Sequence, residues 1–232
     1  MVGNAPGSRL AHFLGEREID HPDVTEAARR WGDDPDLVWQ HLDDGPDLLW
    51  FAGVVGVEPR TVAGVALQAL QAAYDRLGED DQHFPVFQVL DRAEAVLAGT
   101  APPRELEEAG WDAYDRMVYA TSGPPLSGDA DTVMDAAVYA ARAALWVVHA
   151  GDAGAHDDCP DRFDCEDCAD GLRDAAMVPY RLARSSLLPP GEDGDATGDA
   201  EPPSAFWARF VRDRIDAEVV GAAARRIIGE GA

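Results

Sequence analysis

The chain of 232 residues contains no lysine, so every basic side chain other than its six histidines is an arginine. Its 19 arginines stand against 44 aspartates and glutamates, which gives a formal net charge of -25. Proteins that bind a nucleic-acid backbone or an anionic membrane surface need a basic face. The charge therefore disfavours both functions and favours a basic protein partner or cations. An acidic composition is also typical of salt-adapted proteins, so the charge alone does not identify a partner.

Secretion signals and membrane-length apolar segments are missing as well. The first twenty residues include Arg9, Glu16, Arg17 and Glu18 and lack the apolar run behind a basic start that marks a signal peptide. No apolar stretch is expected to reach the length of a membrane span. Three cysteines, an odd number, do not form a disulfide framework. These absences predict a cytoplasmic protein with no membrane segment.

Catalytic signatures are missing too. The sequence has no Gly-rich phosphate loop, Walker motif or Gly-x-Ser-x-Gly elbow. Neither Glu94 nor Glu107 is followed three residues later by a histidine, as the Glu-x-x-His pairs of a di-iron bundle require. The sequence thus favours a non-enzymatic role, although it does not exclude an enzyme.

What the sequence does contain is helical periodicity. Apolar residues recur at spacings of three and four, most clearly between Val62 and Leu77. Thr25, Asp34, Ser204 and either Asp131 or Thr132 are expected to cap helices. The predicted fold class is all-α, a multi-helix bundle without strands. Helices are predicted over residues 9–18, 25–31, 35–42, 46–55, 59–77, 84–98, 104–119, 131–149, 171–188 and 204–228.

Large aromatic side chains are expected to fill the spaces between these helices. Runs of alanine allow helices to approach closely, and bulky rings then pack in the wider gaps. The aromatic residues predicted to serve the core are Trp50, Trp111, Tyr114, Tyr119, Tyr139 and Trp146.

The composition divides the chain into three parts. Residues 1–188 are predicted to form the bundle, and residues 189–203 read as a flexible acidic Pro/Gly linker. Residues 204–232 are predicted to form one amphipathic helix, with Phe206 and Phe210 at the start of its apolar stripe. Such a helix either docks into a partner, with these two side chains as contacts, or folds back onto its own bundle. The second interpretation is favoured, because an amphipathic helix normally buries its apolar stripe against its own protein.

One stretch resembles a known family. Asp47 to Gly53, reading Asp-Leu-Leu-Trp-Phe-Ala-Gly, is followed by apolar or alanine-rich helices over residues 62–77, 93–99 and 133–147. This order is similar to that of all-helical immunity proteins of bacterial polymorphic-toxin systems, over roughly residues 35–150. The resemblance implies a helical protein that inhibits a toxin by binding it, and it supplies no catalytic residues.

An acidic immunity protein would suit a basic toxin domain such as a nuclease, because its carboxylates would cover the phosphate-binding surface. A cluster of acids near the start of the resemblance is the candidate patch, with a solvated face as the alternative. Its members are Asp33, Asp34, Asp36, Asp43 and Asp44.

A loop between two predicted helices holds all three cysteines. His156, Cys159, Cys165 and Cys168 follow the pattern His-x2-Cys-x5-Cys-x2-Cys. Four such ligands suit a tetrahedral structural zinc site. The alternatives are an iron-sulfur cluster, a redox-active Cys165 and Cys168 pair, or free thiols.

The predicted function is that of an immunity-type inhibitor that neutralises a protein toxin. The alternatives are an adaptor or cargo-type protein that docks through its terminal helix, and a small metalloprotein with its site in the loop 156–168.

Overall fold

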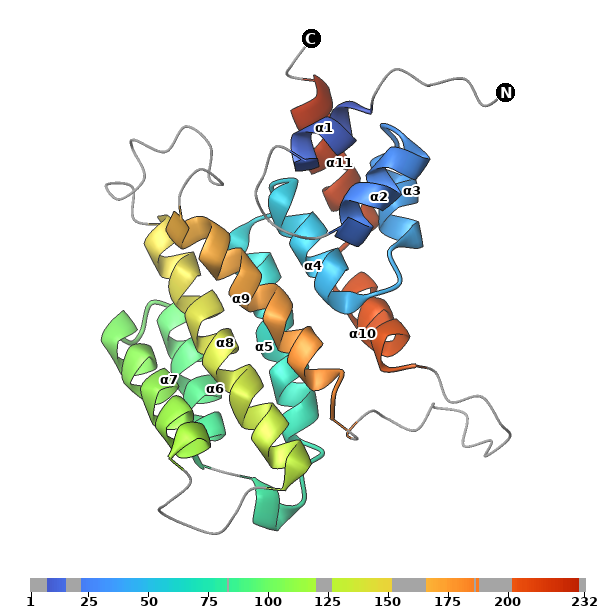
Figure 1. Cartoon of the computed structure of the whole chain (residues 1–232). Helices are drawn as coiled ribbons and strands as arrows, with labels where there is room; N and C mark the ends of the chain where they lie inside the picture. The colour runs from blue at the N-terminus through green and yellow to red at the C-terminus, as the bar shows by residue number, and fades with distance from the viewer. Residues whose placement is uncertain are drawn as a thin grey trace.

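The computed structural model describes residues 8–15, 22–82, 84–119, 127–151, 166–185, 187 and 202–229. These residues form eleven α-helices and one short 3-10 helix, with no strand among them (Figure 1). The all-α prediction is therefore confirmed.

The helices fall into two groups joined by α4 (Gly45–Val54) (Figure 1). The smaller group combines the two ends of the chain: α1 (Arg9–Gly15), α2 (Pro22–Trp31), α3 (Pro35–His41), α10 (Pro203–Arg212) and α11 (Ala217–Gly229). The larger group is the bundle of α5 (Pro59–Tyr74), α6 (Phe84–Leu97), α7 (Pro103–Val118), α8 (Gly128–Gly151) and α9 (Glu166–Leu182). The 3-10 helix η1 (Glu79–Asp81) connects α5 to α6.

Helix α4 is the centre of the molecule. All of its residues are buried, because α9 packs on it from the bundle and α10 from the smaller group. A helix that is apolar all round has no face for water and belongs in a core. Trp50 and Phe51 are completely buried there. The segment that carries the family resemblance is therefore core, and it holds the two groups together.

Helix α8 is the central helix of the bundle and contacts α5, α6, α7 and α9. Its segment Gly128–Ala150 is long and apolar enough to cross a membrane by length and composition, with a mean hydropathy of 1.2. The expectation that no stretch reaches that length is therefore wrong. In this structure 56% of the same segment is buried inside the protein, as in the core helix of a globular domain.

Small residues let α8 and α4 pack closely against α9. A methyl group added at Gly171 would stand 2.2 Å from Cγ of Trp146 on α8. A methyl group added at Gly53 of α4 would stand 2.2 Å from Cδ1 of Leu172 on α9. Helix α4 therefore approaches α9 as closely as α8 does, on another side. Trp146 is buried as predicted, and it lies directly over the backbone of α9.

Arginines cap helices from distant parts of the chain. Arg212 of α10 donates to the carbonyls of Trp39, Gln40 and Leu42 at the end of α3, and the Gln40 contact is 3.0 Å. Arg9 donates to the Ile228 carbonyl at the end of α11 over 3.0 Å. The last carbonyls of a helix lack intrahelical partners, and a guanidinium with five donors can satisfy several at once. A chain without lysine thus uses arginine to join its two ends.

Prolines, more than polar caps, mark where the helices begin. Asp34 caps α3 as predicted, accepting from the Asp36 and Leu37 amides at 3.1 and 3.2 Å. Thr25 does not cap α2, which already starts at Pro22, because proline fits the first helical position. Helix α8 starts at Gly128, with Ser127 Oγ accepting from the Ala130 amide. The predicted cap at Asp131 or Thr132 is therefore wrong.

The predicted single helix over residues 204–228 is also wrong, because two helices occupy that segment. Helix α10 ends at Arg212, and Asp216 begins α11 by accepting a hydrogen bond from the Glu218 amide at 2.8 Å. Across the intervening turn the apolar stripe shifts by one residue. Val220 is buried, while Val219, which helical spacing from Phe206 and Phe210 would place on the continuous stripe, is exposed. Helix α10 packs against the chain's own α4, and α11 packs against α1 and α3.

Candidate functional site

The outer face of α7 carries exposed aromatic residues. Trp111 and Tyr119 are each 61% exposed, and Val118 lies exposed between them in sequence. Tyr114 is half-buried and meets Trp111 edge to face, with ring centroids 5.7 Å apart. Large apolar side chains that are grouped on a surface are typical of interaction sites. We call Trp111, Tyr114, Val118 and Tyr119 the α7 aromatic face.

This face corrects the prediction that all the large aromatics serve the core. Trp50 and Trp146 do so, but Trp111 and Tyr119 do not. Helix α7 lies at the edge of the bundle, where it packs mainly on α6 and α8 and leaves its outer side uncovered by other helices (Figure 1). The sequence did hold a signal. Leu106, Ala109 and Ala113 form the buried stripe of α7, and Trp111 lies on the opposite side of that helical wheel.

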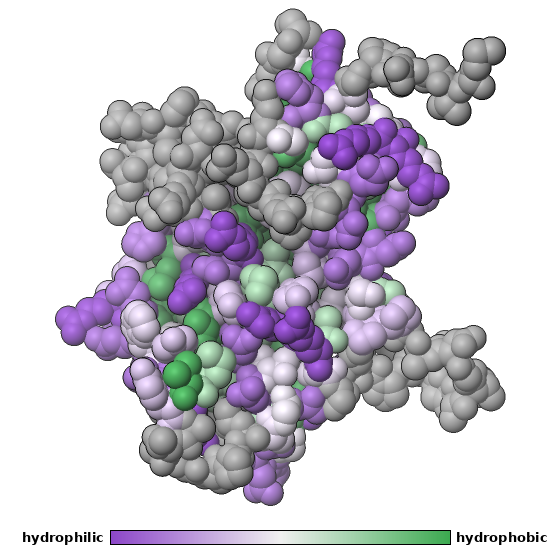
Figure 2. Space-filling model, in the orientation of Figure 1, coloured by the Kyte–Doolittle hydropathy of each residue, from purple (hydrophilic) through white to green (hydrophobic). Residues whose placement is uncertain are grey.

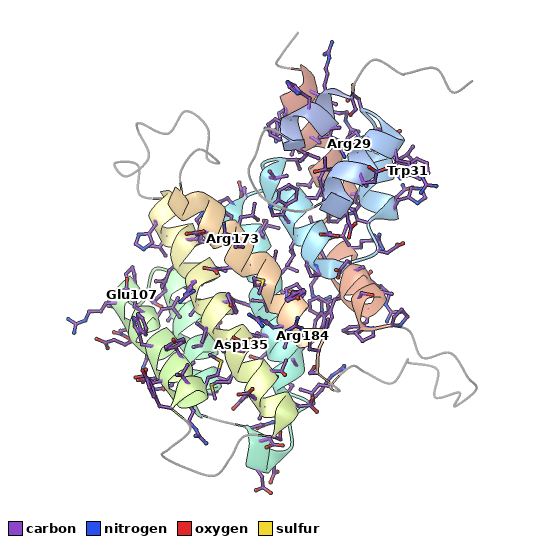
Figure 3. All side chains as sticks on the ribbon, in the orientation of Figure 1. Arg29, Trp31, Glu107, Asp135, Arg173 and Arg184 are labelled. Carbon is purple, nitrogen blue, oxygen red and sulfur yellow. The ribbon has the colours of Figure 1, made fainter. Side chains whose placement is uncertain are left out.

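Carboxylates surround Trp111. Glu107 and Asp115 are four residues away on either side of it, so both are its neighbours on the helix surface. Glu107 projects from α7 toward solvent (Figure 3). Within the part of the chain that the structure describes, Glu107, Asp112 and Asp115 make no ion pair. These carboxylates therefore give the aromatic face an acidic rim.

A cavity of about 100 Å³ opens beside Trp111, between α7 and α8. Apolar atoms reach the surface on this side of the molecule (Figure 2). The two helices approach closely at its floor, where a methyl group at Gly110 would stand 3.1 Å from Cβ of Ala141. Glu107 of α7 and Arg142 of α8 are the charged residues of the lining. The apolar lining residues are Leu106, Trp111, Tyr114, Val138, Ala141 and Leu145.

A polar seam runs along α8 and α9 next to this cavity. Arg181 Nε lies 3.0 Å from Asp135 Oδ2, and an Nη atom of Arg181 donates to the Tyr139 hydroxyl over 3.1 Å. Just beyond the end of α9, Arg184 donates to the hydroxyl of Tyr180 at 2.7 Å. Burial raises the pKa of Asp135 above its ordinary value, and Arg181 only partly opposes that rise. Figure 3 labels Asp135 on α8 and Arg184 just past the end of the neighbouring α9. The seam ties α8 to α9 through paired charges.

Among the carboxyl groups that the structure describes, that of Asp174 on α9 has the largest pKa shift. Burial raises the pKa of Asp174 to about 6, and Asp170 adds to the rise while Arg142 and Arg173 oppose it. Because the folded-state pKa lies above the ordinary 3.8, the folded protein binds the proton more tightly than the unfolded chain does. The stabilisation from this group is complete below pH 4 and is lost as the pH rises through 6.

We expect Asp174→Asn to be more stable than the wild type above pH 6.5, because the amide avoids burying a charge. The gain should be on the order of 1 kcal/mol, since solvent screens this half-buried site. Urea unfolding at pH 8 and pH 4 measures it, and the gap between the two proteins should close at pH 4. Asp112→Asn removes one exposed charge and is the control for net charge. An equal gap at both pH values would contradict the prediction.

The predicted acidic patch is distributed around both ends of α3. Asp33 accepts from the Leu10 amide at 3.0 Å and so helps to begin α1. Asp34 caps α3, and Asp36 pairs with Arg225 of α11 at 2.9 Å. Asp43 is almost fully exposed, with Arg212 3.9 Å away, and Asp44 precedes α4. Asp33, Asp34 and Asp36 therefore have structural roles within the chain, and a role of the patch in partner binding stays a prediction.

The predicted docking residues of the terminal segment lie mostly inside the protein. Phe210 is 7% exposed, and the Arg214 guanidinium covers its ring at 3.4 Å. Phe206 is half-buried and packs against Trp207, with ring centroids 4.9 Å apart. In this conformation Phe210 belongs to the core, and Phe206 remains partly accessible.

The predicted metal ligands fall largely outside the described residues. His156, Cys159 and Cys165 are not among the described residues, while Cys168 lies in the first turn of α9. Among the residues that the structure does describe, no three histidine, cysteine, aspartate or glutamate side chains group as a metal site would. The zinc hypothesis is untouched by this observation.

In comparisons with protein-family models, curated proteins and solved structures, nothing matches the chain. The resemblance to immunity proteins therefore stays a prediction.

Proposed function

We propose that this chain is a non-enzymatic binding protein of the immunity type, which inhibits a basic protein partner such as a toxin domain. The observation that carries the proposal is Trp111, 61% exposed in the middle of an acidic helix face. Tryptophan and tyrosine are the residues that most often dominate the energy of protein interfaces. An aromatic centre with a charged rim is the arrangement such interfaces use, because the rim excludes water and sets partner choice.

The net charge supports a basic partner. A formal charge of -25 attracts positively charged proteins over long range and speeds their association. The same charge repels nucleic acids and anionic membranes, so neither is part of the proposal. A toxin domain that cleaves nucleic acid carries the complementary basic surface. We propose that this inhibition takes place in the cytoplasm.

The adaptor alternative needs the terminal segment to be available to a partner. In the structure α10 covers α4, and α11 packs on α1 and α3. Docking through that segment would have to expose α4, which is buried on every side. The α7 aromatic face requires no such rearrangement, and for this reason it is the preferred interface.

Affinity capture with the tagged chain, followed by calorimetry on the purified partner, tests the proposal. We expect a basic partner that forms a stoichiometric complex and loses its activity in it. Trp111→Ala should weaken that complex at least about 30-fold, the effect of a hot-spot residue worth about 2 kcal/mol. Trp31→Ala is the matched control, because Trp31 lies in the smaller helix group (Figure 3). A partner that binds the Trp111 variant and the wild type equally would refute the α7 interface.

We also propose that the loop 156–168 binds one structural zinc ion through His156, Cys159, Cys165 and Cys168. The support is the spacing of the four residues and the tetrahedral preference of zinc for such ligands. A closed four-ligand site would stabilise the loop and leave no position for substrate.

Metal analysis of the purified protein should then find one equivalent of zinc. Cys165→Ser should lose the zinc and melt at a lower temperature, since metal binding is coupled to folding. His149→Gln, at the end of α8, is the control and should keep both properties. Protein without metal would disprove the site, and bound iron would favour the iron-sulfur alternative.

A further inference from the structure

We infer that the cavity between α7 and α8 receives a single aliphatic side chain of the partner, the size of leucine or methionine. This inference rests on the proposed function and specifies which chemical feature the α7 aromatic face selects. It goes further because it predicts an apolar residue within an otherwise basic partner segment.

The size of the cavity limits the occupant. Pockets for cofactors and drug-sized ligands usually measure about 300 to 1,000 Å³. The space beside Trp111 is about 100 Å³, which suits one side chain and not a whole small-molecule ligand. Hot-spot residues of protein interfaces insert into desolvated pockets of this kind. The occupant is therefore an anchor that projects from a larger molecule.

The lining determines the chemistry of the anchor. Leu106, Val138 and Leu145 supply aliphatic walls, and Trp111 supplies an aromatic one. A cationic anchor would gain from the ring, but it would also meet the Arg142 guanidinium in the same lining. An anionic anchor would meet Glu107 in the same way, and because either charged anchor would also face the opposite charge of the pair, the two effects offset each other. An uncharged aliphatic side chain avoids both repulsions and keeps the benefit of apolar burial.

The surroundings determine the residues that flank the anchor. Exposed carboxylates of Glu107, Asp112 and Asp115 lie on the same helix as the cavity wall. They form no ion pair among the residues described, so cationic groups of a partner would find them available. The matching segment is thus an aliphatic residue between lysines or arginines. Its charge complements the rim, and its aliphatic side chain fills the cavity.

The cavity is first tested alone, with N-acetyl-leucine methylamide at millimolar concentration as the probe. We expect it to shift the methyl NMR signals of Leu106, Val138 and Leu145. N-acetyl-lysine methylamide and N-acetyl-aspartate methylamide should leave those signals in place. Ala141→Leu fills the cavity from α8 and should abolish the shifts. No shift with the leucine compound, or equal shifts with the lysine compound, would overturn the inference.

The complex then separates this inference from the proposed function. Ala141→Leu should weaken partner binding at least about tenfold, as the loss of one anchor site would. If Trp111→Ala weakens binding and Ala141→Leu does not, the interface stands and the anchor is refuted. If neither variant weakens binding, both the α7 interface and the anchor are refuted. Leu145→Phe narrows the same cavity from a half-buried position, and it replaces Ala141→Leu should that variant melt early.

Discussion

Replacing Trp207 with alanine is expected to lower the free energy of unfolding by about 3–5 kcal/mol, the range for removing a large buried aromatic side chain. Trp207 is 3% exposed and lies on α10, against the central helix α4. The contact is close, because a methyl group added at Gly45 would stand 2.7 Å from Cβ of Trp207. Urea unfolding followed by circular dichroism measures the loss.

The control lies in the same terminal segment. Val219→Ala changes an exposed residue of α11 and should alter stability by less than about 0.5 kcal/mol. If Trp207→Ala were as mild as this control, α10 would not be part of the core. The adaptor hypothesis, in which the terminal segment serves a partner and not the fold, would then gain support.

Removing residues 204–232 is expected to destabilise the protein more than the Trp207 substitution does, because it takes away α10 and α11 together. The truncated chain loses the cover of α4 and also Arg212, whose guanidinium satisfies carbonyls at the end of α3. Burial and capping are lost together, so the smaller helix group should unfold with the truncation. A truncated chain that melts like the full one would show that the terminal helices are dispensable to the fold.

Substituting alanine for Gly171 is expected to destabilise the protein by about 1–3 kcal/mol, as overpacking of a tight core does. The new methyl group would stand 2.2 and 2.4 Å from Cγ and Cβ of Trp146. Those atoms are fixed to the backbone of α8 and cannot swing away as the end of a flexible side chain can. The two helices would have to separate, and the seam between Asp135 and Arg181 would be strained with them.

Gly64→Ala in α5 is the matched control, because nothing lies within 4 Å of the methyl group that it adds. The same substitution should there stabilise the protein by about 0.5–1 kcal/mol, the difference in helix propensity between the two residues. Thermal unfolding of the two variants compares them directly. If both variants shifted the melting temperature in the same direction, the close approach of α8 and α9 would be contradicted.

Several features of this protein were determined by the sequence itself. The spacing of apolar residues made the chain helical, because only that period places them on one side of each segment. The run from Leu48 to Val55 is apolar on all faces, and the structure buries all of it. Asp34 before Pro35 sets the start of α3 through bonds between neighbouring residues. These features depend on local interactions, so they could be predicted from the order of residues.

The tertiary structure alone decided which apolar surfaces stay uncovered. Trp50 is fully buried and Trp111 is 61% exposed, because α4 is central and α7 lies at an edge where no further described helix covers it. The break at Asp216 and the packing of α10 and α11 on the start of the chain likewise depend on partners far away in sequence. Arg212 caps a helix some 170 residues earlier for the same reason. Local periodicity sets where helices form, but their neighbours depend on long-range packing, and the candidate binding face follows from that packing.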